Sequence, residues 1–278
     1  MPLTSIQQAV IAVIAANRSQ ESHFAGGLVL NATDDSARFS HDCDIFHEAA
    51  SALTRASEDD VAALRGAGFT VTPAAGDWTK DVDFRKAMVT RGGELVEIDW
   101  AVDSAFRFFP IERDTVLGWR LHLFDMATNK ALAVAARSVT RDYVDIVELG
   151  RIYPLAAIVW AACGKDPGYG PLALLAMMRR FARINPAKLQ EIQARKLDPV
   201  ALKMEWTDQF AKAEQDIIHV ADTMPELPIG IAFVDAAGKP GWIGDDPGLT
   251  LHPPSVRGCL PRIAGLELDL PKPNPSEA

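Results

Sequence analysis

The stretch FRKAMVTRGGELVEIDWAV, residues 84 to 102, constrains the fold more than any other part of the chain. Apolar and polar side chains alternate on both sides of Gly92 and Gly93, which is the pattern of two strands joined by a tight turn. Side chains of a strand point to alternate faces. The second strand has Val96, Ile98, Trp100 and Val102 on one face and Glu97, Asp99 and Ala101 on the other. We therefore expect a β-hairpin with one apolar face and one face that carries carboxylates.

A second alternating segment, FSHDCDIF at residues 39 to 46, carries two more aspartates. As a strand it places Ser40, Asp42 and Asp44 on one face and His41, Cys43 and Ile45 on the other. An aspartate on an adjacent strand, such as Asp99, would complete a cluster of three carboxylates. Such a cluster suits two oxygen-binding divalent cations about 3.5–4 Å apart, the arrangement of two-metal phosphoryl transfer.

Two other interpretations of these aspartates remain open. Zinc would use His41 and Cys43, with His47 as a further ligand, but the first two lie on the apolar side of the strand and no second Cys/His pair is nearby. Alternatively, the Asp-x-Asp pattern is a solvated end of a strand, because so short a pattern occurs by chance in many proteins. The sequence around the pattern favours the hard-cation site over both.

That sequence context has the chemistry of a phosphate site. Gly26 and Gly27 allow backbone N–H groups to approach a phosphate closely. Arg38 lies four residues before Asp42, and a guanidinium is well suited to phosphate oxygens. Ser40, on the Asp42 face, could bond a phosphate or a metal-bound water.

The order of predicted elements divides the chain into a mixed α/β part and a mostly helical part. We expect residues 1–155 to form a mixed sheet with helices, an α+β arrangement, and residues 156–268 to form a mostly helical domain with one β-like segment at 230–244. The last residues, 269–278, are rich in Pro and polar side chains and are expected to be disordered. The predicted helices cover residues 5–17, 47–68, 129–137, 141–152, 154–163, 170–184, 185–196 and 198–224.

Composition excludes several classes of protein. The formal net charge of −9 argues against a chain-wide basic surface for nucleic acid. The three cysteines include no Cys-x-x-Cys pair, so neither a disulfide framework nor a cysteine zinc site is indicated. No apolar run approaches the roughly 18 residues of a membrane span, and the N-terminus has the pattern of an amphipathic helix rather than a signal peptide. We expect a cytoplasmic protein with no membrane partner.

The combined motifs resemble a known family. A Gly-Gly pair followed by Arg-x-Ser-x-Asp-x-Asp resembles the nucleotidyltransferase superfamily with the polymerase β-like fold, and more narrowly the AbiEii-type abortive-infection toxins. HFAGGLVLN stands in the place of the family's Gly-Gly-Thr-Ala-Leu segment, and VEIDWAV matches its third-carboxylate strand. NKALAVAARSVTRDYVDIVEL matches its Lys-x-x-Ala helix followed by Arg/Lys-Asp-x-x-Asp. The resemblance covers roughly residues 8 to 150.

The resemblance implies a role for each matched residue. Two Mg²⁺ ions would join Asp42 and Asp44 to the triphosphate of an NTP such as ATP, and Asp99 would be the third carboxylate, which activates the incoming hydroxyl. The implied nucleotide-binding residues are Gly26, Gly27, Arg38, Ser40 and Lys130. The family's late acidic motif falls at Asp142 or Asp145, of which we favour Asp145. Leu28 replaces the usual Thr or Ser after the Gly pair, which removes one hydroxyl contact to phosphate.

The implied function is transfer of a nucleoside monophosphate from an NTP to an acceptor hydroxyl. The resemblance favours the toxin of a toxin–antitoxin or phage-defence system, with tRNA or a protein as acceptor and an antitoxin as partner. Two alternatives stay open, namely a catalytically silent fold used as a binding or regulatory module and a small-molecule nucleotidyltransferase that modifies, for example, an antibiotic. A basic stretch in the C-terminal half is either a tRNA-binding face or an ordinary solvated helix surface; it holds Arg179, Arg180, Arg183, Lys188, Arg195 and Lys196.

Overall fold

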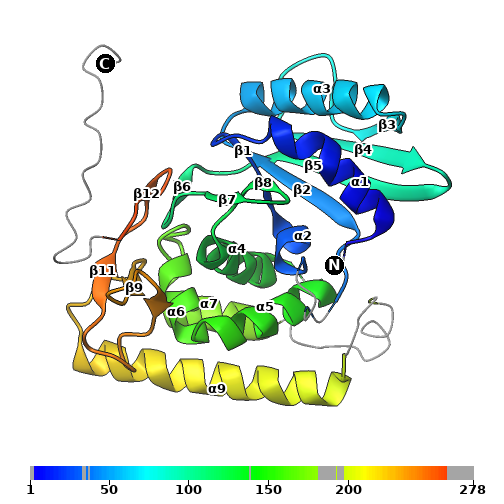
Figure 1. The fold of residues 1–278 in the computed structure, drawn as a ribbon. Coiled ribbons are helices and arrows are strands. Elements are labelled where there is room, and N and C mark those ends of the chain that lie inside the picture. The colour runs from blue at the N-terminus through cyan, green and yellow to red at the C-terminus, as the bar shows by residue number, and fades with distance from the viewer. Residues whose placement is uncertain are drawn as a thin grey trace, which may run out of the picture.

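A seven-stranded mixed sheet forms the first half of the molecule (Figure 1). The computed structural model describes residues 3–32, 36, 38–137, 139–180, 192 and 197–261. The strand order is β3-β4-β5-β2-β1-β8-β7, in which β2 runs parallel to β5 and β1 parallel to β8, while the other neighbours are antiparallel. The strands are β1 (Ser22–Ala25), β2 (Asp42–His47), β3 (Thr70–Ala75), β4 (Phe84–Arg91), β5 (Glu94–Val102), β7 (Glu112–Asp114) and β8 (Gly118–Arg120).

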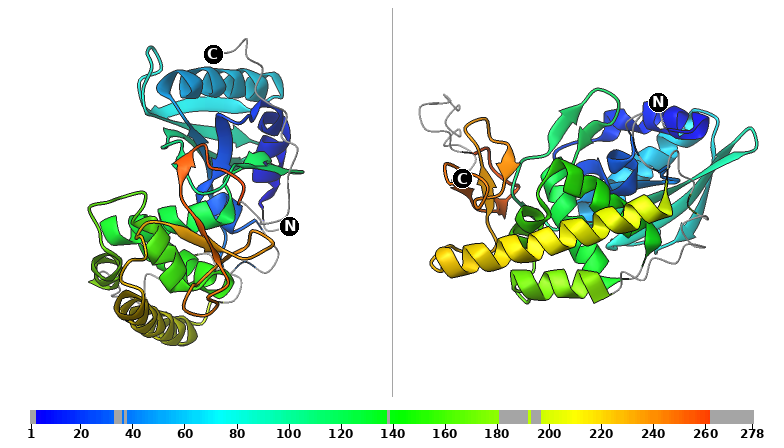
Figure 2. Two further views of the ribbon diagram at one scale, coloured as in Figure 1. Left: turned by 90° about the vertical axis from the view of Figure 1, so that its left-hand side faces the viewer. Right: turned by 90° about the horizontal axis from the view of Figure 1, so that it is seen from below.

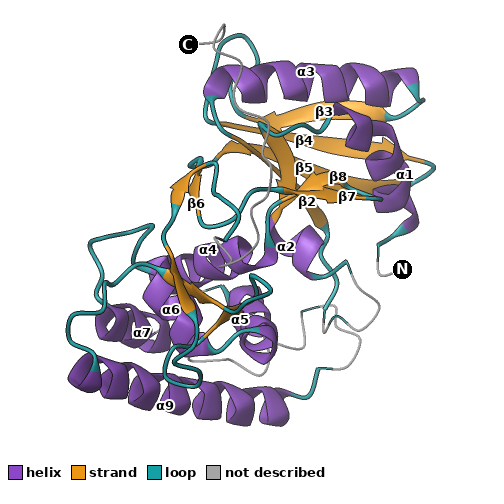
Figure 3. Cartoon of the chain, turned by 60° about the vertical axis from the view of Figure 1, so that its left-hand side comes forward, coloured by secondary structure: helices purple, strands orange, loops and turns teal. Residues whose placement is uncertain are grey.

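Helices α1 (Ser5–Ile14) and α3 (Ala50–Gly66) cover one face of this sheet (Figures 1 and 3). Helix α1 begins with a capping box in which Thr4 and Gln7 each bond the other's backbone N–H. The apolar alternate residues of the two central strands are fully buried under these helices: Cys43, Ile45, Ile98 and Trp100. Because side chains alternate, the acidic residues between them emerge on the opposite face, which α1 and α3 leave uncovered.

A helical half lies against that opposite face. Its helices are α4 (Leu123–Ala136), α5 (Thr140–Ile152), α6 (Leu155–Ala162), α7 (Pro171–Arg180) and α9 (Pro199–Thr223). They share a second hydrophobic core with the small sheet of β9 (Ala232–Val234), β10 (Pro240–Gly241) and β11 (Thr250–His252). Helix α9 runs along the outside of the other helices (Figure 2). It starts at an Asp198 cap with Pro199 in its first turn.

The mixed α/β architecture followed by a mostly helical part is confirmed. The predicted division of the chain into two domains at residue 155 stays a prediction. Helices α4 and α5, which precede that boundary, pack in the second core together with α6, α7 and α9. The predicted tail at 269–278 and nearly all of the predicted helix at 185–196 lie outside the described residues.

Several local elements differ from the sequence prediction. The Gly pair follows a strand, β1, and opens the short helix α2 (Gly26–Leu30), which lies between the sheet and α4 (Figure 3). Strand β2 begins at Asp42, three residues later than predicted. Helix α4 begins six residues earlier than predicted because the His122 ring accepts a hydrogen bond from the Phe124 backbone N–H and caps it. The short strands β6 (Phe106–Arg107), β7, β8 and β12 (Ser255–Val256) were not predicted.

Within the described part of the chain, no helix combines the length and the apolar composition that crossing a bilayer requires.

Candidate active site

Three carboxylates lie together on the uncovered face of the sheet. Asp44 of β2 stands directly beside Asp99 of β5 in the parallel pairing of these strands, and Asp42 precedes Asp44 by one same-face position. All three line a pocket of about 320 Å³ between the sheet and the helical half. The structure therefore brings together three of the predicted site residues that are up to 57 positions apart in sequence (99 − 42).

Asp44 has the most perturbed environment of the three. Its burial and the neighbouring Asp99 and Asp42 charges raise the pKa of Asp44 to about 6, although the Gly27 N–H donates to its Oδ2 at 3.2 Å. Burial also raises the pKa of Asp99 against the opposing influence of Lys86. Both shifts have the same physical meaning: this group of carboxylates lacks enough positive charge from the chain itself.

Only glycine fits at the start of α2. Gly26 has φ +64°, and a Cβ there would lie 2.1 Å from Asp44 Oδ2. A Cβ on Gly27 would lie 2.9 Å from both Ser40 Oγ and Arg38 Nη2. The Gly pair thus lets the α2 backbone approach the carboxylates. Both glycines line the pocket, together with Arg38, Ser40 and Asp44.

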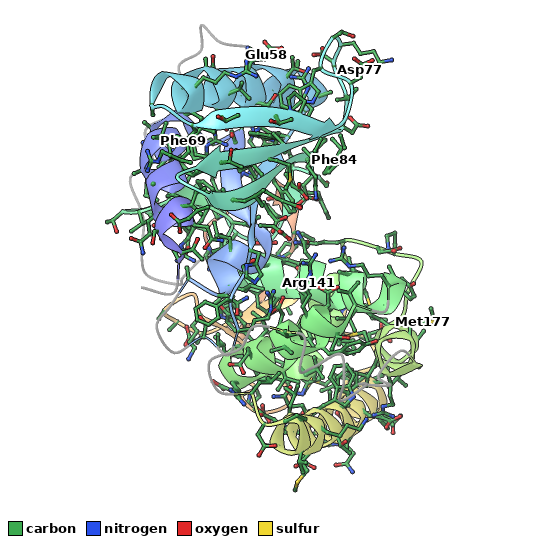
Figure 4. The ribbon with its side chains drawn as sticks, turned by 90° about the vertical axis from the view of Figure 1, so that its right-hand side faces the viewer. Glu58, Phe69, Asp77, Phe84, Arg141 and Met177 are labelled. Carbon is green, nitrogen blue, oxygen red and sulfur yellow. The ribbon has the colours of Figure 1, made fainter. Side chains whose placement is uncertain are left out.

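Two cations of the chain approach the carboxylate cluster from different sides. Lys86 of β4 lies 3.2 Å from Asp99 Oδ1 and 2.7 Å from Glu97 Oε2. Arg141, at the start of α5, lies 3.2 Å from Asp42 Oδ2. Figure 4 shows Arg141 where the helical half meets the sheet half, so this ion pair spans the pocket between them.

A buried ion network forms the helical wall beneath the pocket. Arg38 makes a two-pronged contact with Asp145, with Nε and Nη2 at 2.6 and 2.7 Å from its two oxygens. Lys130 lies 2.7 Å from Asp142 and 2.9 Å from Asp145. Burial opposes ionisation of both aspartates. Lys130 nevertheless keeps their pKa values below the usual range, helped by Arg137 at Asp142 and by Arg38 at Asp145.

The two candidates for the late acidic motif occupy different positions. Asp142 lines the pocket and is also bound by Arg137 at 2.8 Å. Asp145 does not line this pocket; it lies under Arg38 and Lys130 with 2% exposure. Arg141, one helical turn before Asp145 on α5, contacts Asp42 of the sheet. The assignment of either aspartate to the site stays a prediction, since both are buried and only Asp142 lines this pocket.

Comparison with known proteins shows what this arrangement resembles. MenT4, a nucleotidyltransferase toxin from Mycobacterium tuberculosis, superposes with a TM-score of 0.52 at 15% identity over 75% of this chain and 82% of MenT4. JHP933 from Helicobacter pylori superposes with a TM-score of 0.44 at 14% identity over 81% of this chain and 97% of its own. The fold is that of a nucleotidyltransferase. No protein-family model and no curated protein matches the sequence.

The nucleotidyltransferase fold implies a bound Mg²⁺ ion, and the carboxylate oxygens in this pocket fit that ion. The Asp42, Asp44 and Asp99 side chains offer only carboxylate oxygens, which hard divalent cations prefer. The raised pKa of Asp44 indicates that added positive charge would be stabilised there. Among the described residues, however, no three acidic, His or Cys side chains already converge as a metal site.

Zinc does not fit. Cys43 is fully buried in the sheet core, and burial raises the pKa of its thiol far above that of a metal-binding cysteine. His47 is buried and bonded to Ser22 at 3.1 Å, whereas His41 is exposed. The three side chains that a zinc site would use therefore do not converge.

Among the polar residues that line the pocket, Lys86, Arg137 and Asn129 were missed in the sequence. Lys86 could have been found, because a two-residue turn at Gly92-Gly93 pairs Arg91 with Glu94 and hence, five residues further along each strand, Lys86 with Asp99. The other two carry no such signal, since their approach to the pocket depends on how α4 packs against the sheet.

The predicted basic stretch is only partly visible. Arg179 binds Glu214 at 2.9 Å and so belongs to the contact between α7 and α9. Arg183, Lys188, Arg195 and Lys196 lie outside the described residues. Whether this stretch binds tRNA stays a prediction.

Proposed function

We propose that the chain is a metal-dependent nucleotidyltransferase that moves a nucleoside monophosphate from an NTP to an acceptor hydroxyl. The observation that carries this proposal is the side-by-side register of Asp44 and Asp99, with Asp42 adjacent, in a pocket whose helical wall holds Lys130 and Arg141. Carboxylates facing cations across one pocket are suited to a ligand that carries both metal and phosphate.

The chain's own residues would bind and orient the triphosphate. The Gly27 backbone and the Ser40 hydroxyl face the pocket beside Asp44, and Lys130 and Arg137 lie on the opposite wall. Arg38 contributes by positioning, because its three nitrogens already donate to Asp145 and to the Phe39 carbonyl. It therefore holds α5 against the start of the carboxylate strand rather than offering a free fork to phosphate.

Asp42, Asp44 and Asp99 would hold the divalent cations. When bound, Mg²⁺ supplies charge neutralisation for the phosphoryl oxygens and lowers the pKa of the attacking hydroxyl. We assign to Asp99 the acceptance of that hydroxyl's proton, because Asp99 is the carboxylate paired with β4 and Lys86 of that strand holds it in position. Release of pyrophosphate completes the transfer.

The replacement at Leu28 does not alter the lining of the pocket. Its side chain is fully buried in the core under the sheet and does not line the pocket. Loss of the family's hydroxyl at this position therefore leaves the pocket's other phosphate-facing groups in place. The resemblance of the fold to the MenT4 toxin supports the further proposal that the chain is the toxin of a toxin–antitoxin pair, with tRNA or protein as acceptor and an antitoxin as partner.

A transfer assay tests the proposal. Wild type, Asp42→Ala/Asp44→Ala and the control Glu94→Ala, on the same strand as Asp99 but at the exposed turn, are incubated with Mg²⁺, each α-³²P-labelled NTP and total tRNA or the protein alone. We expect label on RNA or protein with wild type and with the control, and none with the double variant. Equal labelling by the double variant, or no NTP binding by wild type, would overturn the proposal.

A further inference from the structure

The candidate pocket is a trough with chemically different ends. At one end Arg141 contacts Asp42, and Arg137 contacts Asp142. Asp44 and Asp99 lie at the centre. The other end is lined by Phe46, Leu121, Met126 and Asn129.

The strand and helix that form the trough run alongside each other, which places Asn129 at the apolar end. Asp103 follows β5, and its backbone N–H donates to the His47 carbonyl at 2.9 Å, next to Phe46. Asn129 Nδ2 donates to Asp103 Oδ2 at 3.3 Å. From Asp42 to Phe46 the strand extends about 13 Å, so this end lies well away from the Arg141 contact.

The orientation of the Asn129 amide is fixed by opposite charges on its two sides. Its Oδ1 accepts a hydrogen bond from Lys165 Nζ at 2.8 Å, while its Nδ2 faces the Asp103 carboxylate. A flipped amide would turn its NH₂ group towards an ammonium and its oxygen towards a carboxylate, and both contacts are repulsive. Lys165 is itself held by the buried Asp125 at 2.8 Å.

This locked amide has unused hydrogen-bonding capacity on a partly exposed side chain. One of its two N–H groups and one carbonyl lone pair have no assigned partner among the described residues. The neighbouring Phe46 side chain is partly exposed and, with the buried Leu121 and Met126 that also line the pocket, makes this end apolar. An apolar surface beside one oriented donor–acceptor group suits a flat heterocycle with polar edges.

The position along the trough identifies which part of the ligand lies there. With the triphosphate between Gly27, Lys130 and Arg141, the nucleoside extends from the central carboxylates along the trough. The acceptor would instead approach across the strands, from the side of Lys86 on β4 and over Asp99. We propose that Asn129, locked by Lys165 and Asp103, hydrogen-bonds the base of the incoming NTP and sets the preference among NTPs; this inference rests on the proposed function.

Binding measurements with and without a base test the proposal. Wild type, Asn129→Leu and Asp103→Asn are titrated with each of the four NTPs and with inorganic tripolyphosphate, all with Mg²⁺. Asn129→Leu keeps the side chain's size but removes the donor and acceptor, whereas Asp103→Asn keeps an oxygen that can accept from Asn129. We expect Asn129→Leu to weaken the preferred NTP roughly 3- to 10-fold, the size of one net hydrogen bond, with the spread among NTPs reduced. Tripolyphosphate affinity should stay within about twofold in both variants, and Asp103→Asn, which weakens the lock but keeps the Asn129 amide, should reduce the spread among NTPs less than Asn129→Leu does.

The outcomes separate this inference from the proposed function. Unchanged NTP affinity and preference in Asn129→Leu would overturn the role of Asn129 while leaving the transferase proposal intact. An equal loss of tripolyphosphate affinity would also overturn it, since the effect would then lie in the phosphate end. A wild type that binds neither ligand removes the proposed function, and the inference with it. If Asn129→Leu does not fold, Asn129→Ala repeats the test without added apolar bulk.

Discussion

The two walls of the pocket hold the same residue type in opposite electrostatic states. On the sheet wall, Asp44 and Asp99 have raised pKa values because burial and like charges dominate. On the helix wall, Asp142 and Asp145 have lowered pKa values because Lys130 and two arginines neutralise them. The difference shows that the chain's own cations neutralise the carboxylates of the helix wall without a ligand. The carboxylates of the sheet wall, by contrast, would be stabilised by cations bound from solution. Substitutions in the sheet wall should therefore reduce activity, and substitutions in the helix wall should reduce stability.

The largest expected effect is on catalysis by the sheet wall. Asp44→Asn should reduce transfer by about three orders of magnitude or more, since a carboxylate that holds the cations is removed. The metal-free variant should be at least as stable as wild type because repulsion within the cluster falls. Steady-state transfer and urea unfolding in EDTA measure the two effects. A variant that is destabilised and fully active would reverse the comparison.

The helix wall should show the opposite pattern in stability. Asp145→Asn leaves Arg38 and Lys130 buried without their shared counter-ion, which costs about 3–5 kcal/mol of unfolding free energy. Urea denaturation measures the loss, and Asp44→Asn under the same conditions is the matched control. A loss of less than about 1 kcal/mol would show that the network is not the structural element described.

The pH dependence of stability sharpens the contrast further. In the folded protein Asp44 keeps its proton up to its raised pKa of about 6, whereas in the unfolded chain it releases the proton near the ordinary aspartate pKa of 3.8. Its contribution is therefore greatest below pH 3.8 and is lost as pH rises through 6. Wild type should lose about 1–2 kcal/mol relative to Asp44→Asn between pH 4 and pH 6.5, less than the full shift implies because the side chain keeps some contact with water. Metal-free urea unfolding at several pH values measures this difference, and a flat or rising difference contradicts the proposed repulsion.

The ion pair that joins the two walls should matter least for stability. Arg141 is half exposed, with its side chain at 50%, so Arg141→Ala should change the unfolding free energy by less than about 1 kcal/mol. Thermal unfolding of wild type and variant tests this, with Arg91→Ala, an exposed arginine on the sheet, as control. A loss comparable to that of Asp145→Asn would mean that the walls are held together mainly by this contact.

The sequence by itself determined the local geometry of the sheet wall. Period-2 alternation puts Asp42 and Asp44 on one face, and the Gly92-Gly93 turn sets the hairpin register that pairs Lys86 with Asp99. The fold class also followed from the order of helices and strands. These features depend on interactions between residues close in sequence, so they can be inferred without the rest of the chain.

Only the tertiary structure decided the composition of the complete pocket. The parallel pairing of β2 with β5 brings Asp44 beside Asp99 across 55 positions (99 − 44), and Arg38 reaches Asp145 across 107. The sequence could not separate Asp142 from Asp145, because one turn of α5 carries both, and only the tertiary packing makes Asp142 line the pocket and pairs Asp145 with Arg38. Such contacts arise when the whole apolar surface of the sheet and helices is buried at once, and no short segment contains the information that selects them.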